Sequence, residues 1–136
     1  MINEENTITN GEEMDLSESE EMYLESILRL SIENDIVRSV DIAKYMDYSK
    51  PSVSVAVKKL KNYGLIKDNN SSSIELTDLG YEIASGVYEK HNVLANILIH
   101  LGVEKKQAIE DACKMEHVIS EESFEIIKKY FESNKN

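Results

Sequence analysis

Apolar residues recur at helical spacing along much of the chain, which predicts a mainly helical protein. The first helix is expected from Ser17 to about residue 33, because Ser17 and Glu20 have the spacing of a capping box. Ser39 and Ser49 can each cap a short helix, and Pro51 fits the first turn of the second, where a missing N–H costs little. We therefore predict one helix followed by two short helices joined by a tight turn.

The apolar pattern changes after Gly64, which is expected to end the third helix. Residues 65–67 and 74–76 are typical of strands, and the turn-forming residues 69–72 lie between them, which predicts a small hairpin or wing. Helix, short helix, helix and wing is the order of a winged helix-turn-helix, whose second short helix enters the DNA major groove. We predict such a DNA-binding domain over residues 17–77.

A second, all-helical domain is predicted over residues 78–136. Thr77 can cap a long amphipathic helix that ends at about residue 101, and two further helices fit residues 104–117 and 121–133. These helices carry more apolar surface than one small domain needs, so we expect part of it to contact a second copy of the chain. The predicted assembly is a homodimer.

One face of the predicted third helix is apolar and suited to packing, whereas the opposite face is polar and available for binding. Its serines can bond to phosphates or base edges, its lysines supply positive charge, and Val55 can touch a thymine methyl group. The candidate DNA-binding residues are Ser39, Ser49, Lys50, Pro51, Ser52, Ser54, Val55, Lys58 and Lys59. A winged helix that contacts only protein remains an alternative at this point.

The charge distribution matters more here than the formal net charge of −11. Residues 1–25 hold nine acidic residues and no basic one, whereas residues 37–67 hold seven basic and two acidic residues. From residue 68 onward, thirteen acidic residues face seven basic ones. A basic middle is compatible with binding to phosphates, although chance clustering on a solvated face would look the same. Residues 1–16 are expected to form a flexible acidic tail.

Length, composition and cysteine usage limit the remaining possibilities. A chain of 136 residues can form one core, or a small head with a dimerisation layer, but not two large domains. No apolar run approaches the roughly 20 residues that span a bilayer, and the acidic N-terminus lacks the layout of a secretory signal. Cys113 is the only cysteine and cannot form an internal disulfide. We expect a soluble, cytoplasmic protein without a membrane partner.

Three potential metal ligands of different types lie close together near the C-terminus. Cys113, Glu116 and His117 occupy positions i, i+3 and i+4 of a predicted helix, which places a thiolate, a carboxylate and an imidazole on one face. Taken alone, this spacing also fits a buried cysteine beside a surface Glu-His pair. The same three residue types could hold a catalytic zinc, but no HExxH motif, nucleophile elbow or phosphate-binding glycine loop accompanies them. We therefore do not expect an enzyme.

Through these and other residues, the chain resembles the iron- and manganese-dependent repressors of the DtxR/MntR family. The resemblance extends over about residues 17–134 and rests on Glu-Met-Tyr-Leu at 21–24, the helix of residues 49–60, and Asp-Ala-Cys-Lys-Met-Glu-His-Val at 111–118. It implies a winged helix followed by a helical dimerisation region, with a metal bound between the two that raises operator affinity. Because the chain stops near residue 136, we expect the short form, without the SH3-like third domain of longer iron-type members.

The resemblance also implies which residues bind the activating metal. The Cys-Glu-His group near the C-terminus matches ligands of the iron-type site, as does Met22 in the first helix. Glu25 matches a ligand of the manganese type, and His91 matches a histidine ligand of both types. The implied ligand set is therefore Met22, Glu25, His91, Cys113, Glu116 and His117.

The sequence departs from the family at an ancillary metal site. Ala95 and Ile109 stand where iron-type members carry a carboxylate and a second histidine ligand, so this site is not expected in its usual form. His100 has no counterpart as a ligand, and we interpret it as a helix-surface residue.

The sulfur ligands Met22 and Cys113 favour Fe(II), Co(II), Ni(II) or Zn(II) over the oxygen-preferring Mn(II), and Fe(II) is the first choice for the cell. The predicted function is a metal-dependent repressor of metal-homeostasis genes that binds double-stranded operator DNA. Two alternatives stay open. One is a Mn(II)-responsive repressor of the same family, and the other is a metal-independent winged-helix regulator in which Cys113 and His117 are structural.

Overall fold

The structure is a computed structural model that describes residues 15–69 and 72–134. The chain divides into two compact units, Met1–Ser85 and Gly86–Asn136. Most of the predicted acidic tail lies outside the described residues, as do Asn70 and Ser71 of the predicted wing turn.

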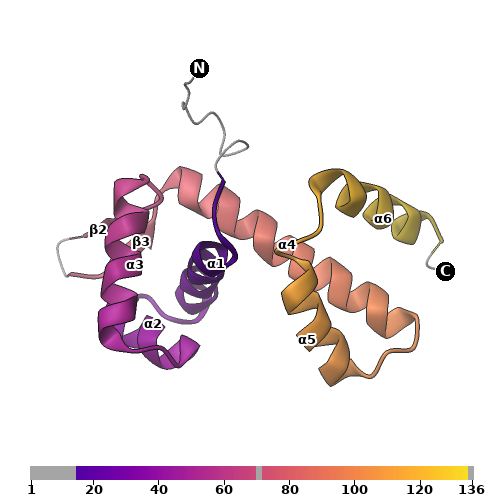
Figure 1. The fold of residues 1–136 in the computed structure, drawn as a ribbon, viewed down its shortest axis with the longest axis horizontal. Coiled ribbons are helices and arrows are strands. Elements are labelled where there is room, and N and C mark those ends of the chain that lie inside the picture. The colour runs from indigo at the N-terminus through magenta and orange to yellow at the C-terminus, as the bar shows by residue number, and fades with distance from the viewer. Residues whose placement is uncertain (1–14, 70–71, 135–136) are drawn as a thin grey trace, which may run out of the picture. The chain divides into compact units, whose positions relative to one another are not determined.

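The first unit contains three helices and a hairpin in the predicted order (Figure 1). Antiparallel pairing places Ile66 of the first strand opposite Leu76 of the second. This arrangement confirms the predicted winged helix-turn-helix. Its elements are α1 (Glu18–Glu33), α2 (Ser39–Met46), α3 (Lys50–Asn62), β2 (Ile66–Asp68) and β3 (Ile74–Leu76), followed by the first turns of α4 (Asp78–His100).

The start of α1 is fixed by the predicted capping box. The Glu20 N–H donates to the Ser17 hydroxyl at 3.1 Å, and the Ser17 N–H donates to a Glu20 carboxylate oxygen at 2.9 Å. Two of the N–H groups that have no partner within the helix are thereby satisfied. The same side chain carries negative charge into the first turn, where the helix dipole favours it.

The prediction that Ser39 caps α2 was wrong, because the cap lies one residue earlier. Arg38 has extended backbone angles and is the N-cap, and its N–H donates to the Asp41 carboxylate at 2.9 Å. Asp41 at the third helical position reaches back to the cap, so Ser39 becomes the first residue of the helix. By contrast, Ser49 caps α3 as predicted, accepting the Ser52 N–H at 3.2 Å.

A tight turn ends α3 and delays the first strand by one residue relative to the prediction. Gly64 adopts a φ of 79°, which favours glycine, and the Leu65 N–H reaches back to the Leu60 carbonyl at 3.0 Å. Leu65 therefore belongs to the turn, and β2 begins at Ile66.

Thr77 joins the start of α4 to this turn. Its hydroxyl donates to the Gly64 carbonyl at 2.7 Å and accepts the Gly80 N–H at 3.0 Å, which confirms it as a cap. The backbone of Gly80 lies so close to Leu65 that a β-carbon at this position would be 1.9 Å from the Leu65 carbonyl oxygen. Only glycine fits this contact.

The core of the first unit gathers apolar side chains from all its helices and from the hairpin. Burying them removes apolar surface from water, which is the main favourable contribution to folding. Among the most completely buried are Leu24, Ile27, Ile42, Val53, Leu60 and Leu65.

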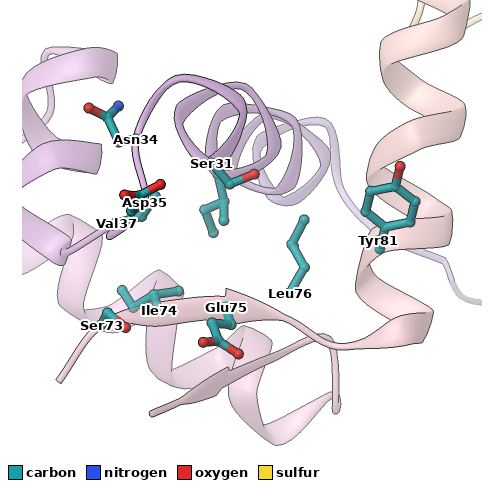
Figure 2. Close-up of a pocket in the computed structure, with 10 residues that line it drawn as sticks. Ser31, Asn34, Asp35, Val37, Ser73, Ile74, Glu75, Leu76 and Tyr81 are labelled. Carbon is teal, nitrogen blue, oxygen red and sulfur yellow. The ribbon is translucent and has the colours of Figure 1, made fainter. Parts of the chain in front are cut away.

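A pocket of about 350 Å³ lies beside this core, between α1, the segment after it, β3 and the start of α4 (Figure 2). Ile27 and Ile74 contribute apolar surface, whereas Asp35 and Glu75 contribute carboxylates. Two negative charges make this pocket unsuitable for a phosphate group.

The second unit consists of the remainder of α4 with α5 (Lys105–Met115) and α6 (Glu121–Asn134). Leu94, Ala95, Ala112 and Phe124 form its buried cluster. The helix α5 ends two residues before the predicted position 117, because a tight turn follows it. None of the described helices is both long and apolar enough to cross a bilayer.

Candidate functional site

The outward face of α3 is exposed as predicted. Val53, Val57 and Leu60 are buried beneath it, whereas the side chain of Val55 is 69% exposed. The candidate DNA-binding residues Ser39, Ser49, Lys50, Pro51, Ser52, Ser54, Val55, Lys58 and Lys59 are all classed as exposed. The first unit therefore presents a polar surface of serines and lysines around a single apolar valine, suited to phosphates and base edges.

Two of these candidates are also tied into the structure. The Ser49 hydroxyl donates to the Ser52 hydroxyl at 2.9 Å while capping α3. Lys59 reaches from α3 to α1, where its ammonium lies 3.1 Å from a Glu20 carboxylate oxygen. The Tyr63 hydroxyl donates to the same oxygen at 3.4 Å.

The pKa values at this contact follow from its hydrogen bonds. Burial of Glu20 favours the neutral acid, but the bonds from Ser17 and Lys59 outweigh it and lower the pKa of the carboxyl. In return, the hydrogen bond and charge of Glu20 raise the pKa of Lys59. Both groups are therefore charged at neutral pH, and Lys59 is shared between α1 and the DNA-reading face.

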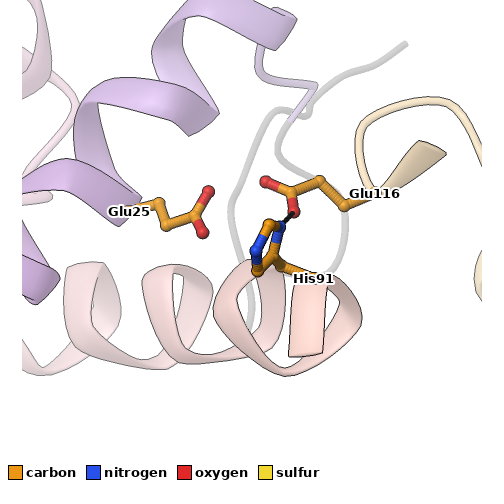
Figure 3. A group of neighbouring side chains, drawn as sticks. All are labelled: Glu25, His91 and Glu116. Atoms are coloured by element: carbon orange, nitrogen blue, oxygen red, sulfur yellow. Dashed lines mark hydrogen bonds and ion pairs between the residues drawn. The ribbon is translucent and has the colours of Figure 1, made fainter. Parts of the chain in front are cut away.

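The two candidate metal ligands of the first unit lie one turn apart on α1. Met22 is half-buried, and Glu25 is 6% exposed and is drawn in Figure 3. The Glu25 carboxylate accepts hydrogen bonds from Arg29, one turn further along, at 2.6 and 3.1 Å. Arg29 was not among the site residues predicted from the sequence, although a glutamate four residues before an arginine is a recognised signal for an ion pair.

The second unit brings three of its four candidate ligands together. Glu116 is 1% exposed, and one of its oxygens lies 2.9 Å from Nδ1 of His91 (Figure 3). Its other oxygen lies 3.1 Å from Nε2 of His117, whose side chain is fully buried. A buried carboxylate therefore lies between two imidazole rings that are 26 positions apart in the sequence.

The fourth candidate, Cys113, lies on α5 and is half-buried. The backbone after it differs from the prediction of a continuous helix. Glu116 still donates its N–H to the Ala112 carbonyl at 2.9 Å, but His117 donates to Lys114, three residues back, at 3.4 Å. His117 therefore lies in a turn after α5 and not in the helix itself.

These residues fit a divalent metal ion. Imidazole, carboxylate and thiolate groups are the ligands that first-row transition metals prefer, and an ionised carboxylate as buried as Glu116 needs a cationic partner. The hydrogen bond to Glu116 uses Nδ1 of His91, so a metal bound by His91 in this geometry would use Nε2. A carboxylate on the other ring nitrogen is a common way to orient a ligating histidine.

Three further residues, Ala95, Ile109 and His100, were not predicted to be metal ligands. Ala95 is buried in the core of the second unit, and Ile109 is 40% exposed on α5. His100 is exposed, and its ring lies edge-on to Phe131 with 5.3 Å between the ring centroids.

Both units match family profiles. Residues 15–72 match the profile described as iron dependent repressor, N-terminal DNA binding domain. Residues 77–136 match the profile described as iron dependent repressor, metal binding and dimerisation domain. The first match covers α1, α2, α3 and β2 of the winged helix, and the second covers α4, α5 and α6 together with His91, Glu116 and His117.

Two relatives illustrate the sequence similarity. An uncharacterised HTH-type transcriptional regulator of Methanocaldococcus jannaschii is 33% identical over 123 residues, which cover 89% of this chain and 98% of the relative. The iron-dependent repressor IdeR of Mycobacterium tuberculosis is 32% identical over 109 residues, which cover 79% of this chain and 47% of the relative. The chain thus spans about half the length of the iron-dependent repressors that it matches.

Comparison with solved structures also finds metal-dependent regulators similar to this chain. The manganese regulator SloR superposes with a TM-score of 0.73 at 30% sequence identity, covering 88% of this chain and 55% of SloR. Fold, site residues and sequence similarity agree, and the chain belongs to the DtxR/MntR family of iron- and manganese-dependent transcriptional repressors.

Proposed function

We propose that this protein is a metal-activated repressor that binds double-stranded operator DNA as a homodimer and controls metal-homeostasis genes in the cytoplasm. The observation that carries the proposal is the buried Glu116 carboxylate between His91 and His117, in the unit that matches a metal-binding profile. The exposed lysines and serines of α3, in the unit that matches a DNA-binding profile, supply the second half of the function.

The proposed ligands come from both units. His91, Cys113, Glu116 and His117 would hold the ion in the second unit, and α1 would contribute Met22 and Glu25 from the first. When bound, the metal supplies a cationic cross-link that restricts the winged helix relative to the dimer. Paired reading helices must lie about 34 Å apart to enter successive major grooves, so fewer wrong spacings mean tighter binding. Coupling between two such sites is typically about 1–3 kcal/mol, or some 5- to 150-fold in affinity.

Fe(II) is the metal that we propose for the cell. The thioether of Met22 and the thiolate of Cys113 are soft ligands, which suit Fe(II), Co(II), Ni(II) and Zn(II) better than Mn(II). Glu25 favours the second candidate, Mn(II), because a carboxylate is the harder ligand. Comparing Fe(II) and Mn(II) anaerobically, on the same operator, distinguishes these two proposals.

The test is metal-dependent operator binding, followed by fluorescence anisotropy with and without Fe(II), on DNA from upstream of the protein's own gene. His117→Ala is expected to abolish the metal dependence, because it removes an imidazole from the buried cluster. His100→Ala is the matched control, since it removes an exposed imidazole of the same unit and should leave the metal dependence intact.

Unchanged metal dependence in His117→Ala would overturn the assignment of this residue as a ligand. Wild-type protein that binds the operator equally well after thorough chelation would favour the alternative, a metal-independent winged-helix regulator. Circular dichroism of both variants separates loss of the metal site from loss of the fold.

A further inference from the structure

Arg29 is the residue closest in sequence to the proposed α1 ligands that carries a full positive charge. Its guanidinium donates to Glu25 through Nη2 at 2.6 Å and through Nε at 3.1 Å, and both bonds end on the same oxygen, Oε2. The Glu25 side chain is 8% exposed and that of Arg29 is 31% exposed. The charge that compensates this buried carboxylate thus comes from its own helix.

Such a contact is strong for physical reasons. Hydrogen bonds between ionised partners are shorter and stronger than neutral ones, and a buried carboxylate without a cation is severely destabilising. Burial of Arg29 opposes its charge, but the Glu25 carboxylate and the Tyr45 hydroxyl outweigh this effect and raise the pKa of the guanidinium. Arg29 is therefore a permanent cation in this position.

Tyr45 connects this pair to the DNA-reading module. It lies on α2, the first helix of the helix-turn-helix, and it is a lesser cause of the raised pKa of Arg29, after Glu25. In this class of module the first helix crosses the DNA backbone while the second reads the bases. The guanidinium thus contacts the helix of the proposed metal ligands and lies near enough to α2 for Tyr45 to influence its charge.

We infer that Arg29 is an internal competitor of the metal for Glu25, and that metal binding releases it from this carboxylate. The inference rests on the proposed function, in which Glu25 is a ligand. A divalent cation on Glu25 would stand beside a guanidinium of like charge, and the two would repel each other while competing for the same carboxylate. Arg29 then lowers the affinity for the metal and so sets the metal concentration at which the protein responds.

The first experiment measures metal affinity directly, by titration calorimetry of the full chain with Mn(II) and with Co(II). Arg29→Met keeps an apolar stem and removes the competing charge, and it is expected to tighten metal binding about tenfold, equivalent to ~1.4 kcal/mol. Arg38→Met is the matched control. It removes the other arginine of the chain, which is exposed at the cap of α2, and should leave the affinity unchanged.

The opposite sign would overturn the inference. If Arg29 instead orients Glu25 as a supporting residue, its removal should weaken metal binding by about 10- to 100-fold. Equal affinity in Arg29→Met and wild type would also overturn it. Wild-type protein that takes up no metal would refute the proposed function itself, so the two failures are distinguishable.

A second measurement needs no variant. The chain has two arginines, so their Nε–H signals are readily distinguished by nuclear magnetic resonance. Titration with diamagnetic Zn(II) should move the Arg29 Nε–H signal, because its bond to Glu25 is lost, and leave that of Arg38 in place. An Arg29 signal that stays unmoved while Zn(II) binds stoichiometrically would show that the ion pair survives metal binding, and would refute the competition.

Discussion

At the scale of single residues, neighbouring lysines on α3 are in different situations. Lys59 is paired with Glu20 of α1 at 3.1 Å, whereas Lys58 belongs to the exposed face that we propose contacts DNA. Each phosphate contact made by a lysine releases counterions from DNA, which makes affinity depend on salt. The role of each lysine can therefore be measured separately from base recognition.

Lys58→Ala is expected to weaken operator binding uniformly across DNA sequences and to reduce the slope of log affinity against log salt by about 1. Fluorescence anisotropy at several salt concentrations measures this slope. Lys106→Ala, which removes an exposed lysine of α5 in the other unit, is the control and should leave the slope unchanged. The same slope in Lys58→Ala as in wild type would exclude a phosphate contact at this position.

The sequence predicts some site residues better than others, for physical reasons. Cys113, Glu116 and His117 are close in the chain, so their spacing and the family resemblance are enough to propose them as ligands. The contact between His91 and Glu116 joins positions 25 residues apart, and no local pattern encodes it. Arg29 was missed although its spacing from Glu25 is visible in the sequence, because the pattern for metal ligands does not include their counter-ions.

At the scale of elements, two glycines of α4 allow the effect of close packing on stability to be compared with the effect of intrinsic helix propensity. Gly80 lies in its first turn with no room for a β-carbon, whereas a β-carbon at Gly86 would have no neighbour within 4 Å beyond the adjoining residues and backbone of its own helix. Both positions have helical neighbours, so alanine at either one gains the same intrinsic helix propensity.

Gly80→Ala is expected to lower the free energy of unfolding by about 1–3 kcal/mol, because α4 must move away from the Leu65 carbonyl. Gly86→Ala is expected to raise it by about 0.5–1 kcal/mol, since glycine costs backbone entropy inside a helix. Urea denaturation of both variants measures the difference. Equal shifts of the same sign would contradict the close approach at Gly80.

The starts of helices were predicted correctly where a single capping side chain determines them. Ser17, Ser49 and Thr77 cap the helices that they were expected to cap. Ser39 does not, because Asp41 reaches back to the Arg38 N–H and moves the start of α2. The end of α5 depends on a turn that places His117 beside Glu116, and helical periodicity alone cannot locate such a turn.

At the scale of the whole molecule, the proposed dimer needs an apolar surface, and the second unit has one. Its exposed large apolar side chains are Ile99, Leu101, Ile109, Val118, Ile126, Ile127 and Tyr130. Isolated exposed apolar residues are normal, and these side chains, among the described residues of the unit, are candidates for the proposed interface. The net charge of −11 opposes association of two copies, so apolar contact must outweigh repulsion.

Ile126→Asp is expected to weaken the dimer by at least about tenfold, because a charge buried at an interface without a partner costs several kcal/mol. Sedimentation velocity over a range of protein concentrations measures the dissociation constant. Ile32→Asp is the matched control, since Ile32 in α1 is 62% exposed against 61% for Ile126. A dimer equally weakened by both substitutions would point to general repulsion and not to an interface on α6.

The contact between Lys59 and Glu20 matters for the proposed role of Lys59 at DNA, because the same ammonium group would serve both contacts. A phosphate that attracts Lys59 draws it from the cap of α1 and leaves the Glu20 carboxylate facing the negative charge of the nucleic acid. The stability of α1 and the proposed binding of DNA would thus compete for the ammonium group of Lys59. A neutral side chain at position 20 is therefore expected to lower the stability of α1 and to free the Lys59 ammonium for a phosphate.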